Sequence, residues 1–404
     1  QLFTSKHPSR SQMKKPITSE ALTVDAKTST VAYASIQTVS NENKIVVTFI
    51  DASGILKKNV FTFGINNDVI TIANVDTSIQ NIQDFNFVSD TTKFVSISND
   101  FLLVSDESKE SIPSIQSSEN SKNKIESLMK STLLLNTKTL TVKNFLNEPS
   151  ICFAASHPYF ATLGNELLIK VFNVDSLKKP SFTIPFYRVS ATSMALSGRF
   201  HMIVVGGFEE LLVYSISKTT LTKRIQLDEG ATPLMVNISP SWGFIVVYAT
   251  IEKTVFKKIE DDYKINRSNN SVDSVSIDNI ENIKVSRNSS SSILLDNAVP
   301  VKEKVAMLST FSVNGELIRK KILPGRIVAL TSWKSASGFD FIAFATDKDK
   351  VYVCEAFFLE IEKGKSVMRC PSSIKELRYS EELQMLVVVT KDGSFFFKPY
   401  VPNE

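Results

Sequence analysis

Histidine and cysteine, the side chains that most often carry catalysis or bind metals, are few and far apart in this chain of 404 residues. The histidines are His7, His157 and His201. They fall at no equivalent positions in the repeated pattern described below, and a metal cage needs several ligands close together. We therefore expect no metal site.

The cysteines predict buried free thiols. They are Cys152, Cys354 and Cys370. An odd number with no CxxC spacing gives neither a disulfide framework nor a zinc site, and free cysteine packs as a small apolar residue. A reducing compartment fits this usage.

Motifs of known catalytic mechanism are also missing from the sequence. It contains no GxSxG, HExxH, GxxxxGK[ST] or GxGxxG pattern, so neither a nucleophile elbow nor a phosphate-binding loop is predicted. The acids Asp340, Asp347, Asp349 and Asp392 fit strand ends and turns. We expect a protein that is not an enzyme and needs no cofactor or small-molecule substrate.

Charge is concentrated at the start of the chain. Residues 1–16 contain four basic residues and no acid, and this segment accounts for the whole net charge of +4. Residues 17–404 are therefore neutral, whereas a nucleic-acid-binding domain is expected to be basic. We expect protein partners and no nucleic acid. The basic segment could also touch an acidic surface of a neighbouring domain.

A repeated unit recurs along nearly the whole sequence. An alternating apolar run ends in a serine, three to five turn-forming residues follow, and a strongly apolar strand comes next. The marker serines are Ser40, Ser89, Ser156, Ser197, Ser239, Ser335 and Ser380. Polar inserts at residues 105–130 and 251–303 lengthen two of the spacings. Without them, seven units of about 40–49 residues remain, close to the period of four-stranded propeller blades.

The sequence therefore predicts an all-β fold, a seven-bladed WD40-like β-propeller with degenerate repeats. Two stacked β-sandwiches are the alternative, but they predict no constant period. The turns Asn314-Gly315 and Lys391-Asp392-Gly393 fit hairpins within units. We expect both tryptophans, Trp242 and Trp333, to be packing anchors.

Closure of the ring can be predicted as well. The last unit shows only three clear strands, so its fourth must come from elsewhere. Residues 30–37 (TVAYASIQ), or the run just before them, could supply it. Borrowing an N-terminal strand removes the exposed edge that an open ring would leave. We expect the two ends of the propeller to meet in one blade.

Both inserts are expected to follow the second strand of their unit and to emerge on the same face of the ring. Their Ser-, Asn- and Lys-rich composition predicts mobility rather than packing. They can be read as tolerated loop growth, since surface loops accept insertions cheaply. They can also be read as docking segments regulated by phosphorylation.

Two parts of the chain resemble a known family. The BEACH-tail motif of QLFTSKHPSR comprises Gln1, Leu2, Phe3, His7, Pro8 and Arg10. It resembles the closing segment of a BEACH domain, with Lys6 where that pattern usually has proline. Residues 310–318, 337–361 and 372–397 look like the last blades of the degenerate WD repeats that follow BEACH domains in neurobeachin-, beige/LYST- and FAN-like proteins.

The resemblance implies that residues 1–16 are the C-terminal tail of a BEACH domain and residues 17–404 the propeller. The chain would be a piece of a longer protein, with the BEACH domain as its partner in cis. It implies a non-catalytic scaffold for membrane trafficking, in vesicle, lysosome or autophagy pathways. We expect it in the cytoplasm, peripheral to endomembranes through the rest of the protein. An unstructured linker remnant is the other interpretation of residues 1–16.

Two other functions remain open at this point. The propeller could be an adaptor of another complex, such as a vesicle coat, a pore or a ubiquitin ligase. It could also be a propeller hydrolase or lyase, which would require acids and histidines to converge at the mouth of the channel.

Overall fold

The computed structural model describes most of the chain between residues 21 and 402. The described ranges are 21–24, 30–39, 42–51, 55–66, 69–81, 93–98, 101–105, 132–136, 142–146, 150–187, 190–258, 298–323, 325–361 and 365–402. They divide into two compact units. The first comprises Gln1–Ile251 and Ala306–Glu404, and the second comprises Glu252–Val305.

The described part of the chain is built from β-strands, and it contains no helix that could cross a membrane. The strands form seven antiparallel sheets of four strands each. We number these sheets as blades in chain order.

Blade 1 comprises β2 (Val31–Val39), β3 (Lys44–Asp51), β4 (Ile55–Asn66) and β5 (Val69–Asn81). Blade 2 comprises β6 (Lys93–Ser98), β7 (Phe101–Ser105), β8 (Thr132–Asn136) and β9 (Val142–Leu146). Blade 3 comprises β10 (Ser150–Ser156), β11 (Tyr159–Gly164), β12 (Leu168–Asn173) and β13 (Phe182–Pro185). Blade 4 comprises β14 (Ser193–Ser197), β15 (Met202–Gly207), β16 (Glu210–Ser215) and β17 (Thr220–Gln226).

Blade 5 comprises β18 (Ala231–Ile238), β19 (Ile245–Lys258), β20 (Ala298–Phe311) and β21 (Leu317–Ile322). Blade 6 comprises β22 (Ile327–Lys334), β23 (Asp340–Thr346), β24 (Lys350–Glu355) and β25 (Met368–Arg369). Blade 7 comprises β26 (Ile374–Ser380), β27 (Met385–Thr390), β28 (Phe395–Pro399) and β1 (Leu22–Val24).

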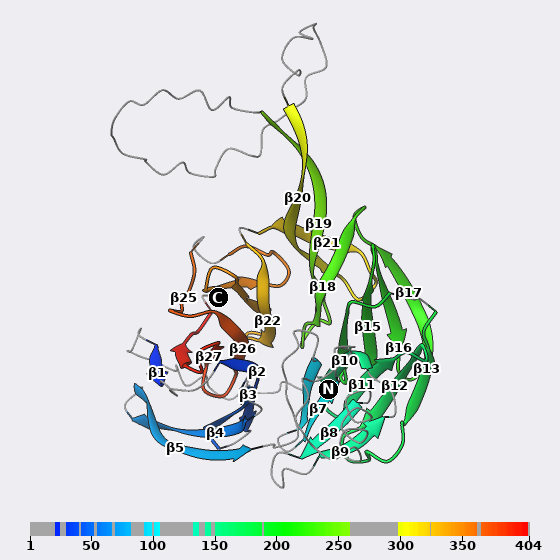
Figure 1. The fold of residues 1–404 in the computed structure, drawn as a ribbon. Helices are drawn as coiled ribbons and strands as arrows, with labels where there is room; N and C mark the ends of the chain where they lie inside the picture. Colours follow the sequence, from blue (N-terminus) through cyan, green and yellow to red (C-terminus); the bar gives the residue numbers. More distant parts are fainter. Residues whose placement is uncertain are drawn as a thin grey trace, which may run out of the picture. The chain divides into compact units, whose positions relative to one another are not determined.

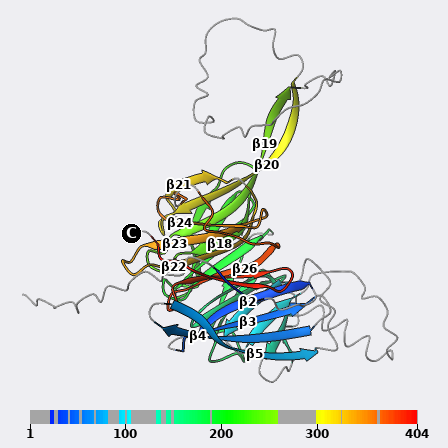
Figure 2. The ribbon, with the colours of Figure 1, turned by 90° about the vertical axis from the view of Figure 1, so that its left-hand side faces the viewer.

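The first strands of the seven blades form a closed ring. The strands β2, β6, β10, β14, β18, β22 and β26 each contact the next, and β26 contacts β2 again. Figure 1 shows the blades arranged around this ring, and Figure 2 shows the strands of blade 1 side by side in order. The first unit is therefore a seven-bladed β-propeller, as the repeat period predicted.

Burial follows the position of each strand in its blade. The second strands β15, β23 and β27 are buried at every residue, because neighbouring blades cover both of their faces. The fourth strands β17 and β21 are mostly exposed. The first strand β22 alternates buried and half-buried residues, as expected when one face lines the channel.

An N-terminal strand closes the ring, as expected. Within β1, Leu22 lies opposite Phe397 and Val24 opposite Phe395 in antiparallel register with β28. Of the two segments suggested by the sequence, the earlier run supplies this strand. Residues 31–39, which include most of the other suggested segment, instead form β2, the first strand of blade 1.

Blade 2 also differs from the predicted repeat. The repeat placed Lys93–Ser98 second in its unit, whereas this segment is β6, the first strand of its sheet. The preceding run and its marker Ser89 lie outside the described residues. The two longest links within blades join β7 to β8 and β19 to β20, which are second-to-third-strand connections as expected.

The two kinds of link define two faces of the propeller. Neighbouring strands are antiparallel, so first-to-second and third-to-fourth turns share one face, which we call the turn face. Second-to-third turns and the links between blades share the other, which we call the link face. The described marker serines, which are Ser156, Ser197, Ser239, Ser335 and Ser380, belong to the turn face.

Candidate interaction surfaces

Four marker serines hold the first turn of their blades on the turn face. The hydroxyl oxygens of Ser197, Ser239, Ser335 and Ser380 accept hydrogen bonds from the backbone N–H groups of Phe200, Phe244, Phe339 and Leu383, at 2.9–3.3 Å. A serine at the end of a strand can bond the following backbone and so fix a turn. The repeated serines therefore have a positioning role in these four blades.

Two marker serines also join neighbouring blades. Ser156 of blade 3 accepts a hydrogen bond from Gly198 N in blade 4, at 3.1 Å. Ser239 of blade 5 donates to the carboxylate of Asp340 in blade 6, at 2.5 Å. Asp340 is 2% exposed and also accepts from the backbone N–H groups of Ser241 and Trp242, each at 2.9 Å. This carboxylate fixes the first turn of blade 5 against blade 6.

The remaining predicted site residues lie outside the described residues. They are Ser40, Ser89 and the BEACH-tail motif Gln1, Leu2, Phe3, His7, Pro8 and Arg10.

The turns fixed by Asp340 carry exposed aromatic side chains. Trp242 follows the first strand of blade 5 and is 61% exposed, and Phe339 occupies the corresponding turn of blade 6 at 49%. Phe357 and Phe358 lie in the third-to-fourth-strand link of blade 6, at 41% and 47%. We call these four residues the aromatic surface.

Contacts with neighbouring residues of blades 5 and 6 position the side chains of the aromatic surface. The Trp242 ring donates from Nε1 to the carbonyl of Gly338, the residue before Phe339, at 3.1 Å. Phe357 packs on Phe244 of blade 5 with ring centroids 5.9 Å apart and on Phe358 at 5.0 Å. The four side chains are therefore presented by rigid turns of two adjacent blades.

Gly243 gives this turn its close packing. Its φ is +69°, and a side chain there would meet Val313 of the β20–β21 turn and Phe200 of blade 4. Val313 is itself 41% exposed. The glycine thus lets the β18–β19 turn pack closely against its neighbours. As a result Val313, an apolar residue, lies next to Gly243, the residue that follows Trp242.

The prediction that both tryptophans are packing anchors was wrong for Trp242. Trp333 is 1% exposed and stacks on Tyr379 with centroids 4.2 Å apart, so it is confirmed as an anchor. Trp242 differs because its turn lies at the surface. Periodicity alone could not separate them, although Trp333 lies inside an apolar strand whereas Trp242 follows Ser-Pro-Ser, a turn signal.

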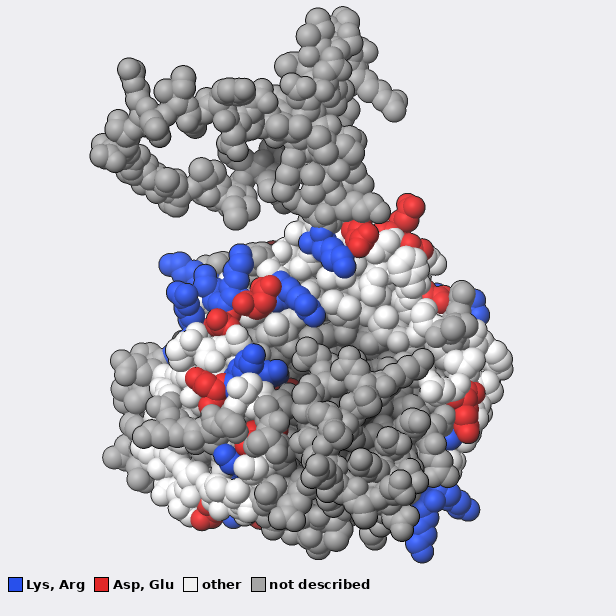
Figure 3. Space-filling model, viewed as in Figure 1, with Lys and Arg blue, Asp and Glu red and all other residues white. Residues whose placement is uncertain are grey.

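The described surface seen in Figure 3 has no large patch of charges that all have the same sign. Lys and Arg side chains lie among Asp and Glu side chains. This agrees with the neutral sum for residues 17–404. A mixed surface favours recognition by shape and apolar contacts over attraction to a polyanion.

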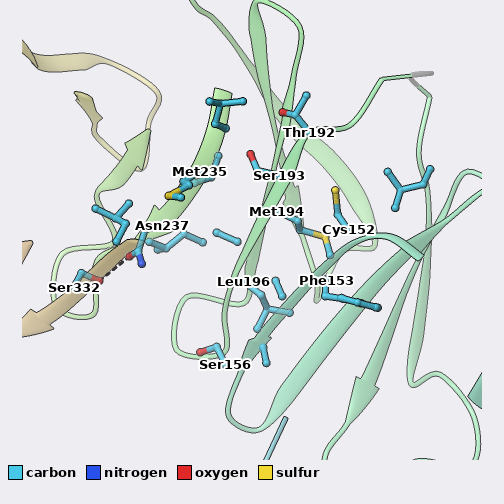
Figure 4. Close-up of a pocket in the computed structure, with 18 of the residues that line it drawn as sticks. Cys152, Phe153, Ser156, Thr192, Ser193, Met194, Leu196, Met235, Asn237 and Ser332 are labelled. Atoms are coloured by element: carbon cyan, nitrogen blue, oxygen red, sulfur yellow. Dashed lines mark hydrogen bonds between the residues drawn. The ribbon is translucent and has the colours of Figure 1, made fainter. Parts of the chain in front are cut away.

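The second candidate site is the central channel. It encloses about 750 Å³ and is lined by the first strands of blades 1 and 3–7. Apolar side chains form part of its wall, among them Phe153 of β10, Met235 of β18 and Leu330 of β22. Figure 4 shows Asn237 and Ser332 together on adjacent strands, where the Ser332 hydroxyl donates to Asn237 Oδ1 at 2.6 Å.

A charged pair lies beside this wall on β26. Arg378 Nε and Glu376 Oε1 are 3.4 Å apart, and their side chains are 53% and 25% exposed. Burial inside the ring raises the pKa of Glu376 to about 7, although Arg378 acts in the opposite direction. Tyr33 of β2 faces the same pair, and its pKa is raised by burial and by the Glu376 carboxylate.

Two of the three cysteines are held as unreactive thiols. All three cysteines are buried and form no disulfide bond, as expected. Burial raises the pKa of Cys354 and of Cys370 to about 12, so neither is a thiolate near neutral pH. Among the described residues no group of histidine, cysteine and acidic side chains could hold a metal ion.

Comparisons with known proteins show the fold and no closer relationship. No protein-family model and no curated sequence matches the chain. Among solved structures, 1257 chains match. One is a chain from the crystal structure of the mitotic checkpoint complex, with a TM-score of 0.52 and 8% sequence identity, covering 98% of this chain and 100% of that one. With the seven blades above, this shows a WD40-like propeller.

Proposed function

We propose that this protein is a non-catalytic scaffold that binds protein partners through the aromatic surface on the turn face of blades 5 and 6. The single observation that carries the proposal is the exposure of Trp242, Phe339, Phe357 and Phe358 on turns of two adjacent blades, with the Trp242 turn held by the buried Asp340 carboxylate. Clusters of exposed aromatic side chains mark interaction sites, and tryptophan is enriched among residues that dominate binding energy.

The proposal of no catalysis rests on chemistry as well as on fold. The described residues bring together an Arg–Glu pair at the channel, and no histidine is among the described residues that line the cavity. A propeller hydrolase or lyase would need such a convergent set. Binding is the function that the described geometry supports best.

The finer proposal is the propeller of a BEACH-domain protein that acts in vesicle and membrane trafficking. It is supported by the QLF…HP.R tail and by the likeness of the last blades to those of BEACH proteins. In this proposal residues 1–16 are the BEACH tail, residues 17–404 the propeller, and residues 105–130 and 251–303 its polar inserts. The protein would lie in the cytoplasm, peripheral to endomembranes.

The alternative is an adaptor propeller of another complex. One of the solved chains that share the fold comes from the crystal structure of the mitotic checkpoint complex. At 8% identity this likeness concerns the fold, so it does not choose among adaptor functions.

Proximity labelling with the full chain tests the proposal. The double variant Trp242→Ala, Phe358→Ala should bind the recovered direct partners at least roughly tenfold more weakly, because losing buried aromatic contacts typically costs about 2 kcal/mol or more. The matched control is Tyr187→Ala, Phe208→Ala, which removes aromatic residues 69% and 56% exposed on the link face.

The outcomes test the docking surface and the membrane-trafficking role separately. Equal binding by the double variant and the wild type would reject the aromatic surface as the docking site. Recovery of partners that include no BEACH-associated or membrane-trafficking protein would instead reject the trafficking role. Circular dichroism of both variants checks that the fold is intact.

A further inference from the structure

The turn-face mouth of the central channel combines one cation, an amide donor and an apolar wall. We infer that this mouth binds an acidic segment of a protein partner, with Arg378 pairing with a carboxylate and the apolar wall receiving a neighbouring apolar side chain. This site is distinct from the aromatic surface, so the inference does not depend on that surface being the docking site.

Strand position brings the polar groups to one end of the channel. Arg378 lies two residues before the end of β26, Asn237 one residue before the end of β18, and Ser332 two residues before the end of β22. The first strands of all blades run toward the turn face, where their first turns begin. These three residues, from three successive blades, therefore lie at the same mouth.

The charge at this mouth favours an anion. Arg378 is the only charged side chain among the described residues that line the cavity, and it is 53% exposed. A guanidinium can bind a carboxylate through two parallel hydrogen bonds. The bond from Ser332 uses the oxygen of the Asn237 amide, so the amide nitrogen keeps its two donors for a ligand.

The wall behind these groups favours a peptide over a small free anion. Phe153, Met235 and Leu330 are half-buried and line the cavity beyond the mouth. A small anion would leave this apolar surface uncovered, whereas an apolar side chain beside the carboxylate would bury it. A volume of about 750 Å³ is within the range of ligand pockets and holds more than one side chain.

Glu376 competes with such a ligand for Arg378. On β26 it lies beside Arg378, and from β2 the Tyr33 phenol faces it. On the other side, β22 presents Leu330 and Ser332 to the channel, and β23 packs an apolar strand against β26. In β27 the residue opposite Glu376 is Val389. Among the described residues of these strands, Arg378 is therefore the charged group that faces Glu376.

Because of this competition, the affinity for the acidic peptide should fall as the pH rises. The pKa of Glu376 is raised to about 7, so below that pH the side chain is mostly neutral and leaves Arg378 to the ligand. Above it, the Glu376 carboxylate pairs with Arg378. A peptide carboxylate, with a pKa near 4, stays ionised throughout. The neutral fraction of Glu376 falls roughly tenfold between pH 6 and pH 8, so binding should weaken by up to about that factor.

A displayed library of random dodecapeptides, selected on the full chain at pH 6, supplies the probe. We expect enrichment of Asp or Glu next to apolar residues. A synthetic peptide from this selection should bind Arg378→Gln at least roughly tenfold more weakly, because a bond between charged groups is lost. Arg319→Gln, at an exposed site on β21, is the matched control and should bind as the wild type does.

Two further variants make the test independent of folding defects. Glu376→Gln should bind equally well at pH 6 and pH 8, because the competing carboxylate is gone. Arg378→Glu should reject the acidic peptide and bind its Lys-substituted counterpart, a gain that an unfolded variant cannot show. The inference is overturned if selected peptides carry no acidic residue, or if Arg378→Gln binds them as tightly as the wild type.

The same peptides separate this inference from the proposed function. Trp242→Ala, Phe358→Ala should retain peptide binding at the channel while losing the partners of the aromatic surface. If the peptides bind Arg378→Gln but do not bind that double variant, the result would support the aromatic surface and reject the channel site.

Discussion

At the scale of single residues, one buried carboxylate connects packing to the exposed surface. Asp340 accepts hydrogen bonds from Ser239, Ser241 and Trp242 while it is 2% exposed. A buried carboxylate is tolerated only when hydrogen bonds compensate for lost solvation. The donors come from the turn that carries Trp242, so the same bonds that satisfy the charge also position the aromatic side chain.

Asp340→Ala should therefore lower the free energy of unfolding by roughly 2–5 kcal/mol, because it leaves buried donors unsatisfied. Urea denaturation of the two proteins measures this difference. The matched control is Asp228→Ala, which removes an exposed ion pair with Lys320 and should cost about 1 kcal/mol or less. Similar losses for the two variants would show that Asp340 has no special structural role.

Contacts between individual residues were also the feature that the sequence predicted least well. The acids were expected to be strand-end and turn residues, and Asp340 is indeed the first residue of β23. Its partners lie about 100 positions earlier, in another blade, and no local pattern reports such a contact. The same limit applies to Arg378 and Asn237, which meet at one mouth only because the ring closes.

At the scale of strands, the sequence was informative because each blade repeats a local pattern. Apolar runs separated by turn residues predicted most first and second strands, and the turns at Gly315 and Gly393 both have positive φ. The prediction failed in blade 2, where two apolar runs lie close together and periodicity cannot choose which enters the sheet. The closing strand is only three residues long, too short for any pattern to identify it.

The closing strand gives a prediction at this scale. Val24→Asp should destabilise the protein by roughly 2–3 kcal/mol, because Val24 packs against the core shared by blades 7 and 1, where a charge is costly. Thr23→Asp is the matched control, since Thr23 is exposed on the same strand and should change stability by less than about 1 kcal/mol. Thermal unfolding of both variants gives the comparison.

Aggregation provides a second measurement for the same pair. Loss of β1 would expose β28 as a strand edge, and such edges promote association. Light scattering should therefore rise for Val24→Asp and stay at the wild-type level for Thr23→Asp. Equal behaviour would mean that β1 contributes nothing to closure.

At the scale of the whole molecule, the first unit is a seven-bladed ring with two different candidate sites near one face. The aromatic surface is apolar and exposed, whereas the channel mouth is enclosed and carries Arg378. A rigid ring suits this division, because each site is built from first strands and turns whose positions are fixed by neighbouring blades. The fold class followed from the sequence, but the location of the sites required the structure.

Hydrogen–deuterium exchange of the full chain, alone and with a direct partner recovered by labelling, shows whether partners dock on the aromatic surface. Partner binding should slow exchange in residues 239–244, 335–339 and 356–361, which form the turns of blades 5 and 6 around the aromatic surface. Exchange in residues 207–209, on the link face of blade 4, should not change. Protection confined to the link face, with none in the turns around Trp242, would show that partners do not bind the aromatic surface.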